Sequence, residues 1–173
     1  QDASPRRIPF QKKIGAGLDL DEFEEKKKAG TLRHVGLTES MHMIAAAFGW
    51  ELDRTEDILI PVIAEETITT GYKPIEEGQA AGVEQIGRGY VDGEELITLT
   101  FRAAVGEKGP ADSIQLSGTP ELFSTIPGGV NGDIATCAIT VNAVSSVLRS
   151  SAGLKTMLDV PPVSYSTMSV SEA

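Results

Sequence analysis

The sequence predicts an α+β fold in which helices lie on one face of an open, mostly antiparallel or mixed sheet. Two segments with helical spacing come first, β-branched and alternating segments follow, and a third helical segment ends the pattern. A chain of 173 residues is long enough to bury one hydrophobic core. We therefore expect one domain over residues 1–173, with a final helix and tail over 131–173.

The N-terminal third is expected to contain a loop and two helices. Residues 1–18 are rich in proline and glycine, which favour extended or looped structure. Asp19 or Asp21 could cap a short helix that Gly30 ends. A second helix is expected over 39–48, because it has apolar residues spaced at i, i+3, i+4 and i+7. These residues are Met41, Ile44, Ala45 and Phe48.

The middle of the chain predicts strands. The β-branched segments cover 58–70, 82–91, 94–105 and 112–118. Asp92-Gly93, between the second and third segments, is a strong signal for a β-hairpin. Three or four consecutive strands are therefore predicted to form an antiparallel meander.

The last helix is expected to follow a glycine-rich run, 126–133, and to end near Arg149. Asn131 or Asp133 could cap it. Backbone N–H groups at such a helix N-terminus are able to hold a phosphate or carboxylate. The run lacks the G-x-G-x-x-G spacing of dinucleotide loops. Both an anion site and a plain loop leading into the helix remain open.

Composition limits the classes of partner. The formal net charge of −10, without a basic stripe, argues against nucleic acid, and no apolar stretch reaches the length of a membrane helix. Cys137 is the single cysteine, so no internal disulfide is possible and a cytoplasmic protein is expected. Its side chain is expected to be a small buried residue. His34 and His42 lie on different predicted elements, so no metal site is expected.

Four segments in order carry a family resemblance. They are 2–17 (DASPRRIPFQKKIGAG), 34–40 (HVGLTES), 126–136 (IPGGVNGDIAT) with Val141-Asn142, and 153–162 (GLKTMLDVPP). Together they resemble the C-terminal part of the 2,4-diaminopentanoate dehydrogenase and native amine dehydrogenase family, relatives of dihydrodipicolinate reductase. The resemblance extends over essentially the whole chain.

The resemblance implies a two-domain, NAD(P)-dependent oxidoreductase roughly twice as long as this chain, which transfers hydride at the carbon that bears an amino group. An N-terminal Rossmann domain would bind NAD or NADP. The matched part would be a dihydrodipicolinate reductase C-terminal-domain-like fold that shapes the pocket for a small amine or amino-acid-like substrate. Its open sheet would form the interface of a homodimer.

The resemblance also suggests site residues. Polar groups for the substrate amine or carboxylate are expected from Ser4, Arg7 and Gln11, and the pocket wall from His34 and Glu39. Contacts with the cofactor ribose or phosphate are expected from Gly128, Gly129 and Asn131. Residues 131–173 would pack towards the Rossmann domain, the catalytic residues stay unknown, and the chain without that domain is expected to be inactive.

Two other classes of function remain open. A non-catalytic, dimerising interaction domain would form a dimer without any ligand-dependent change in melting temperature. A binding protein for a small anion would need the turn at 128–133 to hold its ligand.

Overall fold

In the computed structural model, which describes residues 1–32 and 34–165, the chain divides into two units, Gln1–Gly129 and Val130–Ala173. The division falls inside the glycine-rich run that precedes the last helix. The first unit contains α1 (Ile8–Lys13), α2 (Leu20–Lys28), α3 (Gly36–Phe48), β1 (Arg54–Ile63), β2 (Ala80–Val91), β3 (Glu94–Ala104), β4 (Ala111–Leu116) and β5 (Leu122–Pro127). The second contains α4 (Gly132–Leu148).

The sheet of the first unit is a three-stranded antiparallel meander in the order β1-β2-β3. Asp92 and Gly93 form its second turn with φ values of 53° and 80°, so the predicted hairpin is confirmed. The fourth predicted strand, β4, pairs instead with β5 in a separate two-stranded sheet. The sequence did not predict β5, because its last residues belong to the glycine-rich run.

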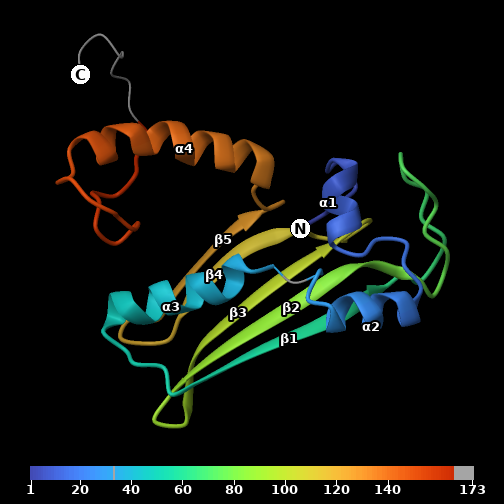
Figure 1. Ribbon diagram of the computed structural model, residues 1–173, viewed down its shortest axis with the longest axis horizontal. Helices are drawn as coiled ribbons and strands as arrows, with labels where there is room; N and C mark the ends of the chain where they lie inside the picture. Colours follow the sequence, from blue (N-terminus) through green and yellow to red (C-terminus); the bar gives the residue numbers. More distant parts are fainter. Residues whose placement is uncertain (33, 166–173) are drawn as a thin grey trace. The chain divides into compact units, whose positions relative to one another are not determined.

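Helices α1, α2 and α3 lie on one face of the meander (Figure 1). The fold class is therefore α+β with helices on one face, as predicted. Glu22 accepts a hydrogen bond from the Asp19 N–H at the start of α2, which agrees with the expected cap. The expectation of a wholly looped segment over 1–18 is wrong, because α1 lies within it. Pro9 is compatible with α1 because the first turn of a helix needs no N–H donor at that position.

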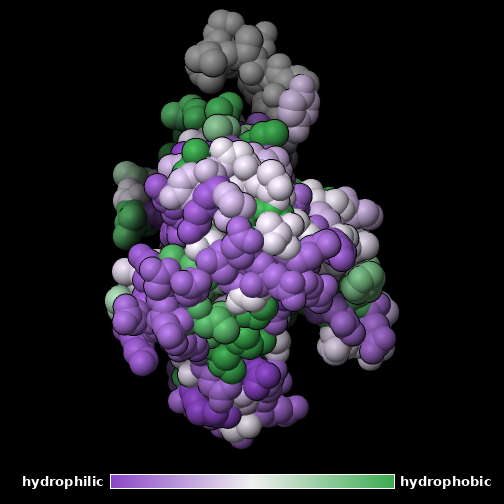
Figure 2. All heavy atoms as spheres, turned by 90° about the vertical axis from the view of Figure 1, so that its right-hand side faces the viewer, coloured by the Kyte–Doolittle hydropathy of each residue, from purple (hydrophilic) through white to green (hydrophobic). Residues whose placement is uncertain are grey.

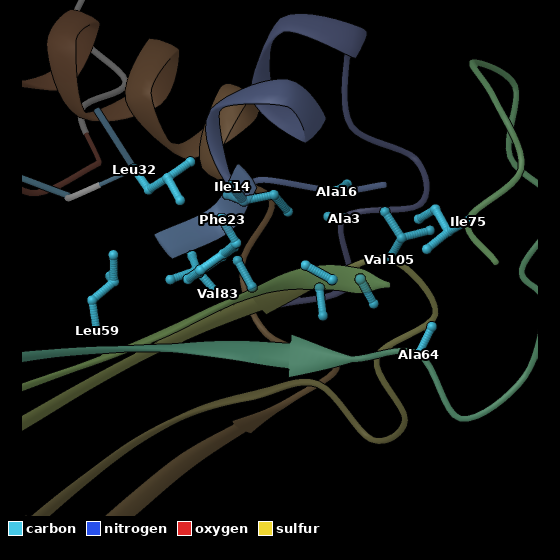
Figure 3. Close-up of a cluster of buried hydrophobic side chains, with 14 residues drawn as sticks. Ala3, Ile14, Ala16, Phe23, Leu32, Leu59, Ala64, Ile75, Val83 and Val105 are labelled. Atoms are coloured by element: carbon cyan, nitrogen blue, oxygen red, sulfur yellow. The ribbon is translucent and has the colours of Figure 1, made fainter. Parts of the chain in front are cut away.

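The main core lies between these helices and the meander (Figure 3). Phe23 of α2 is fully buried and lies close to Val83 of β2 in this cluster. Helix α3 packs separately over Gly87 and Gly89 of β2, where the Met41 side chain lies close to both glycines. The predicted apolar stripe of α3 is only partly buried, because Phe48 is exposed and stacks on Trp50.

The opposite face of the meander, which we call the open face, is not covered by α1, α2 or α3 (Figure 1). Its centre is apolar, with Ile58 and Ile60 of β1 about two-fifths exposed and Ile86 of β2 paired with Ile58. Charged side chains surround this centre. They form the ion pairs Arg54–Glu56, Arg88–Glu56, Arg88–Glu95 and Arg102–Glu84.

The second unit is built on α4. Asn131 caps this helix as expected, since its side-chain oxygen accepts hydrogen bonds from the N–H groups of Asp133 and Ile134. Most of its large apolar side chains are exposed, and so is Cys137, which the sequence predicted to be buried. Exposed hydrophobic side chains also form patches between hydrophilic ones on the surface in Figure 2. None of the helices in the described residues has the length and apolar content needed to cross a membrane.

Candidate functional site

The predicted substrate-binding segment at the N-terminus is hydrogen-bonded to the end of β3. The Ala3 N–H donates to the Ala104 carbonyl oxygen at 2.8 Å, and the Ala3 side chain is fully buried. The Ser4 hydroxyl donates to an Asp2 carboxylate oxygen at 2.7 Å and accepts from the Gly106 N–H at 2.9 Å. The hydroxyl of Ser4 therefore helps to fix the segment, and its contact with a substrate stays a prediction.

The side chain of Gln11 of α1 forms hydrogen bonds with the same segment. Its side chain is buried, and its amide nitrogen donates to the carbonyl oxygens of Ala3, Ser4 and Arg6 at 3.0–3.3 Å. A buried amide is stable only when it is hydrogen-bonded, and here the chain itself supplies the acceptors. Gln11 thus sets the conformation of the residues before Arg7. Its predicted contact with the substrate is a separate proposal.

Basic side chains gather around α1. Arg7 is exposed at the start of the helix, and the Arg6 guanidinium lies 4.0 Å from the centre of the Phe10 ring. Nearby, the Lys12 ammonium lies 4.8 Å from the centre of the Tyr72 ring, and the Lys73 ammonium donates to the Gly17 carbonyl oxygen. In a chain with a net charge of −10, this local positive charge suits an anionic group such as a carboxylate or a phosphate.

The second predicted segment, around His34, is held over the meander. The imidazole of His34 lies on the Phe101 ring of β3, with ring centroids 4.8 Å apart and a 40° angle between planes. Gly36 leaves room for it, because a Cβ there would lie 3.0 Å from His34 Cε1. The side chain of Gln85 accepts a hydrogen bond from the His34 N–H at 2.7 Å. The ring of His34 therefore packs on Phe101, whereas its backbone N–H is held by Gln85.

Both predicted substrate segments are anchored on β3. The N-terminal segment pairs at Ala104 and the His34 ring lies on Phe101, three residues earlier. At about 3.3 Å per residue, these anchor points are roughly 10 Å apart. Glu39 is different. It is exposed on α3 at about 200° around the helix from the buried Met41, on the side away from the sheet.

The residues predicted to contact the cofactor lie where the chain passes from the first unit to the second. Gly128 and Gly129 have φ values of +83° and +67°, which favour glycine. The Gly129 N–H donates to the Ile126 carbonyl oxygen at 3.0 Å, and the Asn131 side chain accepts from the first N–H groups of α4. These groups close the turn and cap the helix, so contact of Gly128, Gly129 and Asn131 with a cofactor stays a prediction.

Sequence reasoning missed Gln85 and its partner Asp57. Gln85 alternates with Val83 and Gly87 on the face of β2 that the helices cover. A polar residue at an inward position of such a strand is the signal that could have found it. Within the described residues, no group of three or more histidine, cysteine or acidic side chains is placed to hold a metal ion.

The comparisons with known proteins identify the family. The model of the 2,4-diaminopentanoate dehydrogenase C-terminal domain matches residues 2–172. The chain belongs to this family. The resemblance seen in the sequence is thereby confirmed.

A related sequence and a protein of the same fold show how much of a longer chain is matched. A 2,4-diaminopentanoate dehydrogenase of Acetoanaerobium sticklandii is 31% identical over 164 residues, which cover 91% of this chain and 46% of that protein. The structure of an amine dehydrogenase from Mycobacterium smegmatis has the same fold, with a TM-score of 0.82 at 18% identity, over 96% of this chain and 50% of that one. The chain therefore spans about half the length of each of these two proteins.

Proposed function

We propose that this chain is the substrate-binding and oligomerisation domain of an NAD(P)-dependent amine dehydrogenase. Such an enzyme transfers hydride between nicotinamide and the carbon that bears an amino group, through an imine. The observation that carries the proposal is the anchoring of two segments on one strand. The segment that leads to Arg7 and the segment of His34 are held roughly 10 Å apart along β3.

The substrate in this proposal is a small amine or an amino-acid-like molecule. The exposed Arg7 guanidinium and the other basic groups around α1 would attract a carboxylate. The imidazole of His34, fixed against Phe101, would line the wall of the pocket. The groups that transfer protons during catalysis would come from the N-terminal domain.

A Rossmann domain N-terminal to this chain would bind most of the NAD or NADP. The lengths of the relatives support a second domain, since the matched region covers only about half of each. Helix α4 supports it as well. A helix that is apolar on all sides is normally buried, and α4 exposes Ile134, Val141 and Leu148. We propose that α4 and the tail after it pack against that domain, in a cytoplasmic enzyme.

The open face would form the interface of a homodimer. An apolar centre at Ile58, Ile60 and Ile86 within a rim of charged residues is typical of protein interfaces. The rim alternates arginine and glutamate, so two copies could pair opposite charges across a twofold axis. A non-catalytic dimerising domain would share this surface, so the two functions are separated by an activity assay and by whether a ligand changes the melting temperature.

The test is an assay of the full-length protein. We expect reduction of NAD⁺ or NADP⁺, followed by nicotinamide absorbance, that depends on an added amine. The panel would contain 2,4-diaminopentanoate, simple alkylamines and α-amino acids. A folded full-length protein that reduces neither cofactor with any of these amines, nor runs the reverse reaction with ketones and ammonia, would contradict the proposal and favour the interaction domain.

Arg7→Ala tests the substrate role of the N-terminal segment. We expect kcat/KM of the full-length enzyme to fall tenfold or more, because a charge-assisted contact with the substrate is lost. Lys28→Ala, an exposed cation at the end of α2, is the matched control and should leave kcat/KM unchanged. An unchanged kcat/KM in Arg7→Ala would remove Arg7 from the site.

A further inference from the structure

We infer that Gln85 is a positioning residue for the candidate site, which acts by holding the backbone of His34 over the meander. The inference rests on the proposed function, because it gives His34 a place in the substrate pocket. Gln85 itself is fully buried. It therefore acts through the segment that it supports.

Three hydrogen bonds define the support. The side-chain oxygen of Gln85 accepts from the His34 N–H at 2.7 Å. Its side-chain nitrogen donates to Asp57 Oδ1 at 2.8 Å and, at 3.4 Å, to the His34 carbonyl oxygen. A backbone N–H only donates and a carboxylate only accepts, so the orientation of the amide is determined by its partners. The side chain of Gln85 thus joins β1, β2 and the segment before α3.

The position of this glutamine points to a role in conformation. Its neighbours on the inward face of β2 are Val83 and Gly87. An apolar side chain in place of Gln85 could be buried at this position without any hydrogen-bond partner. Gln85 also pairs across the sheet with Phe101, the residue under the His34 ring. Two opposite residues of β2 and β3 therefore hold the backbone and the ring of the same histidine.

The first experiment compares two glutamine-to-methionine variants in the full-length enzyme. Gln85→Met keeps the approximate size of the side chain and removes its hydrogen bonds with His34. Gln79→Met is the matched control, because Gln79 likewise donates to an aspartate oxygen, that of Asp19, at 2.8 Å. We expect Gln85→Met to lower kcat/KM tenfold or more and Gln79→Met to leave it unchanged. Equal kinetic effects would overturn the inference.

A double-mutant cycle separates positioning from general destabilisation. If Gln85 acts through His34, then Gln85→Met should have little further kinetic effect in a His34→Ala background. Additive losses of kcat/KM would contradict the inference.

One readout does not depend on activity. The Phe101 ring should shift the imidazole proton resonances of His34 in NMR spectra. These resonances are assigned as the ones that disappear in His34→Ala. We expect these resonances to move towards unfolded-chain values in Gln85→Met and to stay in place in Gln79→Met. Unmoved resonances would overturn the inference even if the enzyme is an amine dehydrogenase. Absence of amine-dependent activity in the unchanged enzyme would instead contradict the proposed function, and the NMR result would then decide the inference.

Discussion

Two buried glutamines hold the backbone segments that carry the candidate site. Gln11 donates to three carbonyl oxygens of the N-terminal segment, and Gln85 bonds both backbone groups of His34. An amide suits this task because it offers donors and an acceptor on one short, neutral side chain. The segments are consequently fixed in the folded domain, and Arg7 and His34 are presented from defined backbone positions.

Gly36→Ala tests the space around His34. The new Cβ would lie 3.0 Å from His34 Cε1, so the ring would have to move by a few tenths of an ångström. Because alanine favours helix over glycine by up to about 1 kcal/mol, the stability of α3 should stay equal or rise. We expect kcat/KM to fall several-fold while the melting temperature does not fall.

Gly71→Ala is the control for this substitution, since a Cβ at Gly71 meets no atom within 4 Å and its φ is not in the left-handed region. Neither variant should melt at a lower temperature than the unchanged enzyme, and only Gly36→Ala should lose activity. Full activity of Gly36→Ala would show that the orientation of the His34 ring does not matter.

At the level of elements, β2 is the central strand of the meander, and its glycines allow both the neighbouring strand β3 and helix α3 to approach it closely. Gly82 lies against the Ala103 carbonyl of β3, and Gly87 lies under Met41 of α3. The difference between these neighbours has a consequence for stability. A backbone carbonyl cannot move without disturbing the sheet, whereas the end of a methionine side chain adapts.

Gly82→Ala should therefore destabilise the protein more than Gly87→Ala. The new Cβ at residue 82 would overlap the Ala103 carbonyl oxygen, and we expect a loss of about 3 kcal/mol. At residue 87 the Cβ would lie 2.7 Å from Met41 Cε, and the loss should be about 1 kcal/mol. Thermal unfolding followed by circular dichroism measures both. A loss in Gly87→Ala equal to that in Gly82→Ala would mean that α3 is held rigidly.

Several elements were predictable because their signals are local. The caps at Asp19 and Asn131 and the Asp92-Gly93 turn depend on side chains within a few residues of the backbone groups that they satisfy. Helix α1 was missed because proline and glycine dominate its neighbourhood. Strand β5 was missed because its pairing with β4 depends on a partner segment rather than on its own pattern.

At the level of the whole molecule, the open face of the meander is the surface on which the oligomeric state would depend. Its apolar centre belongs to the first unit, which contains both anchored substrate segments. In the proposed homodimer, the faces bearing α1, α2 and α3 would be directed away from the interface. Each protomer would then keep its own access to the substrate segments.

Ile60→Asp on the open face should separate the proposed dimer. The substitution would bury a carboxylate in the apolar centre of the interface, which is costly without a partner. Analytical ultracentrifugation of the full-length enzyme should show monomers. Leu20→Asp, on the helical side and similarly exposed (44% against 42%), should remain dimeric. A dimer that survives Ile60→Asp would place the interface elsewhere.

The sequence by itself determined the fold class, the family and the segments of interest, because helical spacing, strand alternation, caps and ordered motifs are local in the chain. It also indicated Ser4, Arg7, Gln11 and His34 as candidate site residues, but not which of their atoms form hydrogen bonds within the domain. Only the tertiary structure decided that Ser4 and Gln11 support their own segment and that Gln85 holds His34. The acceptors of Gln11 lie only five to eight residues away along the chain, but α1 has to form and pack against that segment. Gly106 and His34 lie 102 and 51 residues from Ser4 and Gln85, and these pairs meet only because the N-terminal segment pairs with β3 and the His34 segment packs over the meander.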